Sequence, residues 1–542
     1  MRKKLVKFFS FFVFILSAGF VLSSCGQSQE NAGQKAEDTT SQGEESKETS
    51  SGEPKDGGVF VRAIGKDPAT FNPNAVSDNI TYLISQNIYN KLLKINGEDK
   101  IVPDLAESYE VSEDGKVITF KLKKAKWHDG EDLTADDVKW TFDTIKAKEG
   151  FAAPSLADIQ EVKVVDDSTV EFHLSAPNAG ILGAIAWQGT YIMPSHLYKD
   201  SEDWLEADAS KNPVGSGPFK FVEYKPGESI TLEKNADFFG QTPHLDQIKM
   251  VVMPDQDTTY QAWLAGEIDG GAGIPEEEFK NFENNPDYQK VKLSWPNKSY
   301  FCFNMEKGKF ADPKVREAVL YGINIDEIFE KGLKSVGEKQ KYFIPWQYDW
   351  AINESIQSPE RDVEKAKKLL EEAGYTQDEN GFYFETTIDT FPGWDEIMPI
   401  FQSQFAEFGI KLNHNSMDDP TYDQKVLEKK DFELTVLGGY MGPDISSLSN
   451  RFGTGGFINY GLYSSEEMDA LLEEGIRTTD PEKRAQPYKK IQELLRKDLP
   501  AVFFSDKYGT DYVKSYLKGF PASDEAKEFC SEAEYTYLWL DK

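Results

Sequence analysis

Strand and helix signals alternate along the chain from residue 58 to its end without a fixed repeat length, and this alternation limits the fold to the mixed α/β class. The clearest strand is predicted at residues 117–123, where Ile118, Phe120 and Leu122 alternate with polar residues. Hairpins are also predicted, and they cover residues 162–174 with a turn at 166–168 and residues 219–233 with a turn at 225–227.

Several helices are predicted from side chains that accept hydrogen bonds from free backbone N–H groups at a helix start. These residues are Thr134, Asp312, Asp362 and Asp480. Pro487 lies inside the last of these helices and has no N–H group to donate. We therefore expect Pro487 to kink or restart that helix.

The N-terminus has the order of charge and hydrophobicity that an export signal needs. Four basic residues precede an apolar run at residues 8–22, which is shorter than the about 20 residues of a bilayer span. The run is followed by Ser23, Ser24 and Cys25, and this end resembles the lipobox of bacterial lipoproteins. The sequence therefore predicts a signal peptide at residues 1–24 and a lipid on Cys25. A plain signal peptide or an uncleaved anchor is the alternative.

Residues 25–57 are rich in Ser, Thr, Glu, Gln and Gly and contain little that a core would bury. Such a segment does not offset its own ordering entropy, so we predict a disordered tether. Beyond it, about 485 residues remain without a long apolar run, and this length predicts two or more lobes.

The charge of the chain restricts its partners. The formal net charge is −33, and removal of the four basic residues of the signal makes it −37. Nucleic acid and anionic lipid surfaces are therefore poor partners, because phosphate binding needs concentrated positive charge. The two cysteines beyond Cys25, Cys302 and Cys530, are too few for a disulfide framework. A single pair and two separate buried thiols both stay open.

The order of several short segments resembles the family 5 solute-binding proteins, the receptors of oligopeptide, dipeptide and nickel importers. The resemblance covers residues 58–542 and is most specific between residues 105 and 142. Its segments are Ala-Glu-Ser-Tyr at 106–109, Trp-His-Asp-Gly at 127–130, Thr-Ala-Asp-Asp-Val at 134–138, Gly-Ser-Gly-Pro-Phe at 215–219, Leu-Ala-Gly-Glu-Ile-Asp at 264–269, Asp-Pro-Lys-Val-Arg-Glu-Ala at 312–318, residues 362–375 and Pro-Glu-Lys-Arg at 481–484.

The resemblance implies a two-lobed periplasmic-binding-protein-like fold, type II and cluster C-like, with an extra subdomain inserted in the first lobe. The implied first lobe combines residues 58–93, 213–298 and 509–542. The insert is residues 94–212 and the second lobe is residues 299–508. Solute is expected in the cleft between the lobes, and closure is expected to hide it from water.

By the same resemblance, a glycine- and aromatic-rich strand of the second lobe holds the peptide backbone, and an aspartate after it pairs with the peptide ammonium group. The matching residues are Gly438, Gly439 and Tyr440. The acidic residue, Asp444, comes about one position late, and Pro443 stands near its expected place. Two roles stay open for Asp444, the ammonium anchor and a turn residue that caps Ser446 or Ser447.

Other cleft candidates are aromatic or amide residues in predicted loops, where binding residues tend to lie. Core packing is the alternative role for each of them. They are Tyr82, Trp187, Trp346, Trp394, Asn459 and Tyr463.

The predicted function is therefore an extracytoplasmic substrate-binding protein of an ABC importer. It is expected to be monomeric, to be anchored to the outer face of the bacterial cytoplasmic membrane by its lipid, and to deliver oligopeptides to a permease. We expect no enzyme activity, because hydrolase, zinc and phosphate-loop motifs are absent, and we expect no cofactor or metal ligand set. An oligosaccharide or a metal complex as the solute, and a peptide sensor without transport, stay open as alternatives.

Overall fold

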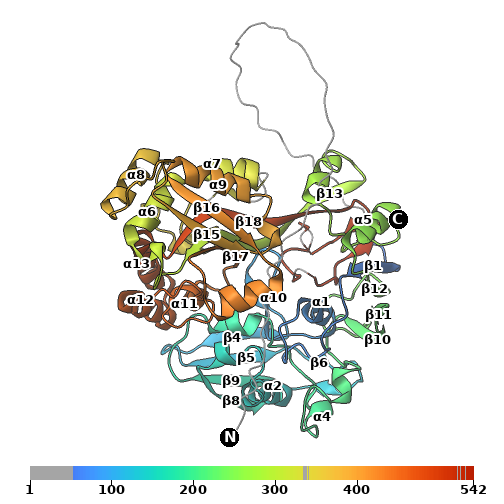
Figure 1. The fold of residues 1–542 in the computed structure, drawn as a ribbon. Helices are drawn as coiled ribbons and strands as arrows, with labels where there is room; N and C mark the ends of the chain where they lie inside the picture. The colour runs from blue at the N-terminus through green and yellow to red at the C-terminus, as the bar shows by residue number, and fades with distance from the viewer. Residues whose placement is uncertain (1–52, 334–337, 340, 522, 525, 532) are drawn as a thin grey trace, which may run out of the picture.

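The computed structural model describes residues 53–542 except 334–337, 340, 522, 525 and 532 (Figure 1). The predicted signal peptide, Cys25 and nearly all of the predicted tether lie outside this part of the chain. Three larger sheets with their helices form the body, and the sheet that contains β15 and β16 lies above the other two in Figure 1. Within the described residues, no helix has the length and apolar character needed to cross a membrane.

A four-stranded mixed sheet contains the start of the described chain. Its order is β1-β12-β11-β10, and only β1 and β12 run parallel. β10 and β11 form the hairpin that was predicted around residues 225–227, so this prediction is confirmed. The elements are β1 (Val59–Ile64), α1 (Asn79–Ile88), β10 (Phe219–Lys225), β11 (Ser229–Lys234), β12 (Gln247–Val252) and α5 (Gln256–Ala265).

A second, antiparallel sheet with the order β4-β5-β9-β8 lies between β1 and β10 in the sequence. Ile118, Phe120 and Leu122 are buried on one face of β5, as the alternation predicted. The predicted hairpin is confirmed too, because β8 and β9 pair around residues 167–168. The elements are β2 (Leu93–Ile95), β3 (Ile101–Pro103), β4 (Ala106–Val111), β5 (Val117–Leu122), α2 (Ala135–Ala147), β8 (Ile159–Asp166), β9 (Thr169–Leu174) and α3 (Ile181–Ala186).

A third sheet of six strands has the order β14-β18-β13-β17-β15-β16. α9 packs against β16 on one face of this sheet. The elements are β13 (Tyr288–Phe303), α6 (Pro313–Gly322), β14 (Glu338–Lys339), η6 (Trp346–Ala351), α8 (Val363–Glu372), β15 (Phe384–Thr390), α9 (Met398–Glu407), β16 (Ile410–Ser416), α10 (Asp419–Tyr422), η8 (Asp423–Glu428), β17 (Leu434–Tyr440), η9 (Ile445–Leu448), α11 (Ser449–Phe452), α12 (Glu466–Arg477), α13 (Pro481–Asp498) and β18 (Ala501–Lys514).

Most of the buried apolar residues fall into two large clusters, and a third, small cluster surrounds Trp263. One joins the first two sheets, so the β4-β5-β9-β8 sheet shares its core with the β1 sheet. The other lies within residues 300–504 and belongs to the six-stranded sheet. Two separate cores are what a chain of this length requires.

Two long antiparallel strands, β13 and β18, connect the two cores (Figure 1). Val291 and Val513 are buried in the first core, whereas Phe301 and Phe503 are buried in the second. The predicted lobe boundaries at residues 298 and 508 fall inside these strands and stay predictions. A strand pair with one end in each core is suited to act as a hinge between the lobes.

The predicted helix starts at Thr134, Asp312, Asp362 and Asp480 are confirmed, because each residue stands directly before a helix. The expected restart of the helix at Pro487 is wrong, whereas the expected kink stays a prediction. α13 runs without interruption from Pro481 to Asp498 and contains Pro487 as a buried residue. Packing of this face against the second core stabilises the helix despite one missing N–H donor.

The Trp-His-Asp-Gly segment links α2 to the residues that precede β10. Trp127 is buried, and its indole N–H donates to Asp137 over 3.3 Å. His128 Nδ1 accepts from the Gly215 N–H at 3.2 Å, so its Nε2 carries the proton and donates to Gly217 O at 3.0 Å. Burial lowers the pKa of His128 to about 4, because the charged ring would lose its water. The imidazole is therefore a structural, neutral hydrogen-bond bridge.

Cys302 and Cys530 are not paired. Both thiols are free and buried, Cys302 in the second core and Cys530 beside the first. Burial raises the pKa of the Cys302 thiol to about 12 and also raises that of Cys530. The sequence left open a disulfide and two separate buried thiols, and the structure shows the separate thiols.

Candidate solute-binding cleft

The end of β17 offers one strand edge with no strand beside it. Gly438, Gly439 and Tyr440 pair with β13 on one side. On the other side, β15 pairs with β17 only at Leu434 and Thr435, so within the described residues no strand covers the edge from residue 436 to residue 440. Gly438 and Gly439 are both partly exposed. An extended solute backbone can therefore approach this edge at Gly438 and Gly439, whereas Val436 is buried and its carbonyl oxygen already accepts from the Tyr422 hydroxyl at 3.4 Å.

Glycine suits both positions for different reasons. Gly439 has a φ of +129°, a conformation that L side chains rarely adopt. Gly438 has ordinary backbone angles, and a Cβ atom there would only reach normal contact with Lys298 and Ser299 of β13. The lack of side chains at both positions leaves the strand edge open to another backbone.

Tyr440 brings the second lobe against the inserted segment. Its ring stacks on Trp187, with ring centres 4.9 Å apart and planes 20° apart. Trp187 follows α3 of the β4-β5-β9-β8 region. The Tyr440 hydroxyl also donates to Asp99 at 3.4 Å, and Asp99 lies in the turn between β2 and β3. Two of the predicted site residues, Trp187 and Tyr440, therefore form one aromatic wall at the end of the open strand edge.

Asp444 already has a cationic partner. Its two carboxylate oxygens accept from Arg484 Nη1 at 2.9 Å and from Arg484 Nη2 at 2.5 Å. Its carboxylate also accepts from the Ser446 N–H, which is the turn role that the sequence left open. The side chains of Asp444 and Arg484 are 15% and 9% exposed. A carboxylate neutralised in this way is poorly placed to bind an ammonium group, and we assign Asp444 a structural role.

Four other predicted site residues are buried and hold the fold. The Tyr82 hydroxyl donates to Val76 O at 2.5 Å, and Trp394 packs edge-on against Phe504. The remaining two bind each other: the Asn459 amide donates to Tyr463 O at 2.7 Å, and the Tyr463 hydroxyl donates to Asp498 at 2.7 Å. Trp346 begins η6, but its side chain lies outside the described part of the structure. None of the four buried residues is brought to the Trp187–Tyr440 wall.

The structure adds residues that the sequence did not indicate. Arg451 of α11 donates to Tyr440 O at 2.9 Å and to the Tyr300 hydroxyl at 2.8 Å. Arg451 therefore holds the end of β17 in place. Asp99, on the other side of Tyr440, stands in an ordinary Asn-Gly-Glu-Asp turn. Turn residues of this type are common, so the sequence carries no signal for its position.

A second set of contacts holds the inserted segment to the second lobe. Arg477 at the end of α12 forms an ion pair with Asp158 at 2.7 Å and donates to Pro177 O at 3.0 Å. The Ala179 N–H donates to Ile476 O at 2.8 Å. Together with the aromatic stack, these contacts hold the inserted segment directly against the second lobe.

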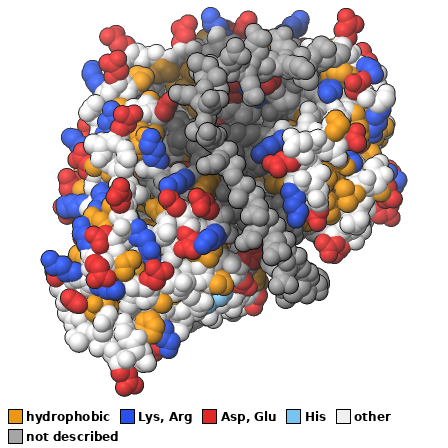
Figure 2. All heavy atoms as spheres, turned by 90° about the horizontal axis from the view of Figure 1, so that it is seen from above, with side chains coloured by type: hydrophobic (Ala, Val, Ile, Leu, Met, Phe, Trp, Pro, Cys, Tyr) orange, Lys and Arg blue, Asp and Glu red, His pale blue; other side chains and the backbone are white. Residues whose placement is uncertain are grey.

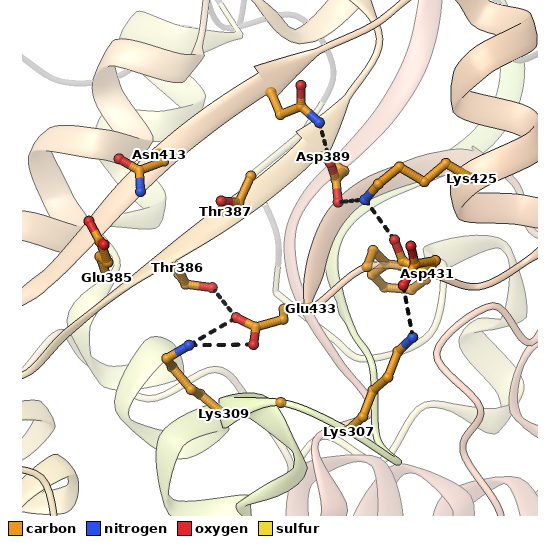
Figure 3. Close-up of a pocket in the computed structure, with 13 residues that line it drawn as sticks. Lys307, Lys309, Glu385, Thr386, Thr387, Asp389, Asn413, Lys425, Asp431 and Glu433 are labelled. Atoms are coloured by element: carbon orange, nitrogen blue, oxygen red, sulfur yellow. Dashed lines mark hydrogen bonds and ion pairs between the residues drawn. The ribbon is translucent and has the colours of Figure 1, made fainter.

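A polar crevice of about 500 Å³ lies on the second lobe beside β15 and β16 (Figure 3). Its three lysines each have a carboxylate partner: Lys307 with Asp431, Lys309 with Glu433 and Lys425 with Asp389. Because these charges are already compensated, the crevice offers no strong attraction for a charged ligand. We do not place the solute there.

The described residues contain no group of three or more His, Cys, Asp or Glu side chains that could hold a metal ion. Charges of both signs are mixed on the face shown in Figure 2, where blue and red side chains alternate around the outline. The described residues of this face therefore show no concentration of positive charge of the kind that nucleic acid binding needs.

Two lobes, a connecting strand pair and a strand edge between them define the class of two-lobed solute-binding proteins. The family model of bacterial extracellular solute-binding proteins, family 5, middle part, matches residues 100–459. The chain therefore belongs to the family 5 extracellular solute-binding proteins, as its sequence motifs predicted. This membership also confirms the prediction of a solute-binding protein rather than an enzyme.

Individual relatives cover nearly all of the chain. It is 30% identical to the Heme-binding protein A of Haemophilus influenzae over 94% of this chain and 96% of that protein. It is 29% identical to the Dipeptide-binding protein of Escherichia coli over 84% of this chain and 90% of that protein.

Solved structures confirm the predicted fold. The ABC transporter substrate binding protein CtaP of Listeria monocytogenes matches with a TM-score of 0.81 and 27% identity over 90% of this chain and 100% of that chain. The oligopeptide-binding protein AppA of Bacillus subtilis, solved with a nonapeptide, matches with a TM-score of 0.72 and 25% identity over 90% of this chain and 100% of that chain. The α/β fold of periplasmic binding proteins is thereby shown for this chain.

Proposed function

We propose that this chain is the substrate-binding protein of an ABC importer that captures peptides between its two lobes and delivers them to a membrane permease. The observation that carries this proposal is the open edge of β17, which runs through Gly438 and Gly439 and ends at the stack of Tyr440 on Trp187. A strand edge binds any peptide through its backbone, and an aromatic wall limits where the peptide ends.

The names of the relatives support a peptide or a related solute. Relatives of known structure hold a nonapeptide in AppA of Bacillus subtilis and the peptide STSA in DppA of Helicobacter pylori. Others are named for heme in Haemophilus influenzae or hold Ni(L-His) in NikZ of Campylobacter jejuni. An open strand edge favours a peptide over these solutes, because only a peptide backbone has the matching pattern of donors and acceptors.

We propose further that the chain is exported, cleaved before Cys25 and held by a lipid on that cysteine at the outer face of the cytoplasmic membrane. The basic start, the short apolar run and the Leu-Ser-Ser-Cys sequence at residues 22–25 support this proposal. Residues 26–57 would then connect the membrane to the folded body.

The first test is native mass spectrometry with ligand release on the full chain, extracted in mild detergent. A closed cleft often retains solute from its host, so we expect a mixture of short peptides in the released fraction. Affinity for these peptides is then measured by isothermal titration calorimetry for wild type, Trp187→Ala and a control, Tyr109→Ala. Tyr109 is an exposed tyrosine on β4 of the same sheet region.

We expect Trp187→Ala to weaken peptide binding about 10-fold, since it removes one face of the aromatic wall. The control is expected to keep the affinity of wild type. Release of a sugar or a metal complex, with no affinity for peptides, would overturn the peptide proposal and leave the solute-binding class intact. Equal affinities in all three proteins would remove the Trp187–Tyr440 wall from the site.

A further inference from the structure

Asp99 reaches across the cleft from a tightly held turn. The turn between β2 and β3 is closed by hydrogen bonds of Asn96, whose N–H donates to Lys100 O at 2.9 Å and whose side chain accepts from the N–H groups of Glu98 and Lys100. Asp99 has a φ of +62°, which asparagine and aspartate tolerate better than other side chains. The backbone therefore fixes the position of Asp99 in the turn, and its carboxylate reaches the hydroxyl of Tyr440 in the other lobe.

The charge of Asp99 has no cationic partner. Among the described residues, no Lys, Arg or His forms an ion pair with its carboxylate, and its contact with the Tyr440 hydroxyl is a long hydrogen bond of 3.4 Å. The neighbouring Glu98, by contrast, pairs with Lys100 at 2.7 Å and with Lys527 at 3.9 Å. Lys100 and Lys527 thus pair with Glu98 and not with Asp99.

The partial burial of the Asp99 carboxylate is costly without a cation. It raises the pKa of Asp99 to about 7, and the Tyr440 hydroxyl offsets this only in part. In such surroundings, a positive charge beside the carboxylate strongly stabilises its ionised form. The stacked rings of Tyr440 and Trp187 lie next to it, and aromatic faces also attract cations.

We propose that Asp99 is the residue that binds a positively charged group of the solute, such as the ammonium group of a peptide, at the Trp187–Tyr440 wall. This inference rests on the proposed function, since it assigns one end of the solute at the same site. It also assigns the cation to the inserted segment, because Asp444 of the second lobe is occupied by Arg484. The open edge of β17 would hold the rest of the backbone.

The test is competition between free and N-acetylated forms of the same short synthetic peptides. The full chain is incubated with an equimolar mixture of both forms, and the bound peptides are counted by mass spectrometry. Three proteins are compared: wild type, Asp99→Asn and Glu98→Gln. Asparagine fits the backbone of the turn and removes only the charge, and Glu98→Gln removes a charge from the same turn that faces Lys100.

We expect wild type and Glu98→Gln to prefer the free amino form about 10- to 100-fold, and Asp99→Asn to lose most of this preference. Without solute, Asp99→Asn should unfold at the same temperature as wild type or a higher one, because it removes a partly buried charge that has no cationic partner among the described residues. An equal preference in Asp99→Asn and wild type, or a lower unfolding temperature in Asp99→Asn, would overturn the role of Asp99 alone. Capture of neither peptide form by any of the proteins would overturn the peptide proposal together with it.

Discussion

Replacement of Asp444 separates a structural carboxylate from a binding one. In Asp444→Asn, Arg484 keeps its charge and loses its carboxylate partner, while its side chain stays 9% exposed. Removal of one partner from a buried ion pair costs about 3–5 kcal/mol. We take the lower end, because Arg484 still donates to Gly475 O at 3.1 Å and still faces the ring of Trp350 at 5.5 Å.

A loss of about 3 kcal/mol corresponds to about 6–12 °C in a folding unit the size of the second lobe, at about 2–4 °C per kcal/mol. Differential scanning calorimetry measures this shift, and Asp132→Asn is the matched control. Asp132 forms an ion pair with Lys126 at 2.8 Å, but both side chains are more than half exposed. Its loss should therefore leave the unfolding temperature almost unchanged, because water screens an exposed ion pair.

The double variant Asp444→Asn with Arg484→Met should recover part of the lost stability, because it removes the unpaired cation as well. Peptide affinity, measured by calorimetry below the unfolding transition, is expected to change less than about 3-fold in Asp444→Asn. An unchanged unfolding temperature in that variant, together with a loss of affinity for free-amino peptides, would refute this reasoning and restore Asp444 as the ammonium anchor.

Three further predictions concern the lobe contact, the buried histidine and the cysteines. Arg477→Met, which breaks the pair with Asp158, should raise the radius of gyration of the empty protein in small-angle X-ray scattering; an unchanged radius would contradict a role in closure. Because the folded pKa of His128 is lowered to about 4, its neutral form stabilises the fold above about pH 6.5, and about 3 kcal/mol should be lost as the pH falls to about 4. Urea unfolding should show less of this loss in His128→Gln. Cys302 and Cys530 should react with a thiol reagent only after unfolding, whereas a disulfide would leave them silent.

Much of the fold was predictable because its signals are local. A strand with one buried face has apolar and polar residues in alternation, as β5 does around Ile118 and Phe120. A helix start needs a capping side chain beside it, as Asp362 is for α8. Pro487 did not end the helix, because its cost of a few kcal/mol is local, whereas the packing that outweighs it comes from distant parts of the second core.

The site was predictable only where backbone geometry determines it. The resemblance indicated Gly438, Gly439 and Tyr440 as one strand end, and the structure places them at the open edge. Charge pairing was not predictable in the same way. The partner of Asp444 stands 40 residues further along the chain, and no spacing rule relates the two.

The positions of these two carboxylates also indicate how solute and closure depend on each other. Asp444 meets its cation within the second lobe, so its charge is compensated whether the lobes are open or closed. Asp99 meets Tyr440 only when the inserted segment and the second lobe come together. When the lobes close without a solute, the carboxylate of Asp99 loses water and gains no cationic partner. When they close around a solute cation, that cation replaces the lost water.

A ligand shifts a conformational equilibrium only by its difference in affinity for the two states, and a cation beside Asp99 supplies such a difference. The preference of this receptor for the closed form should thus depend on the charge of the solute at one end, which links recognition to the movement of the lobes.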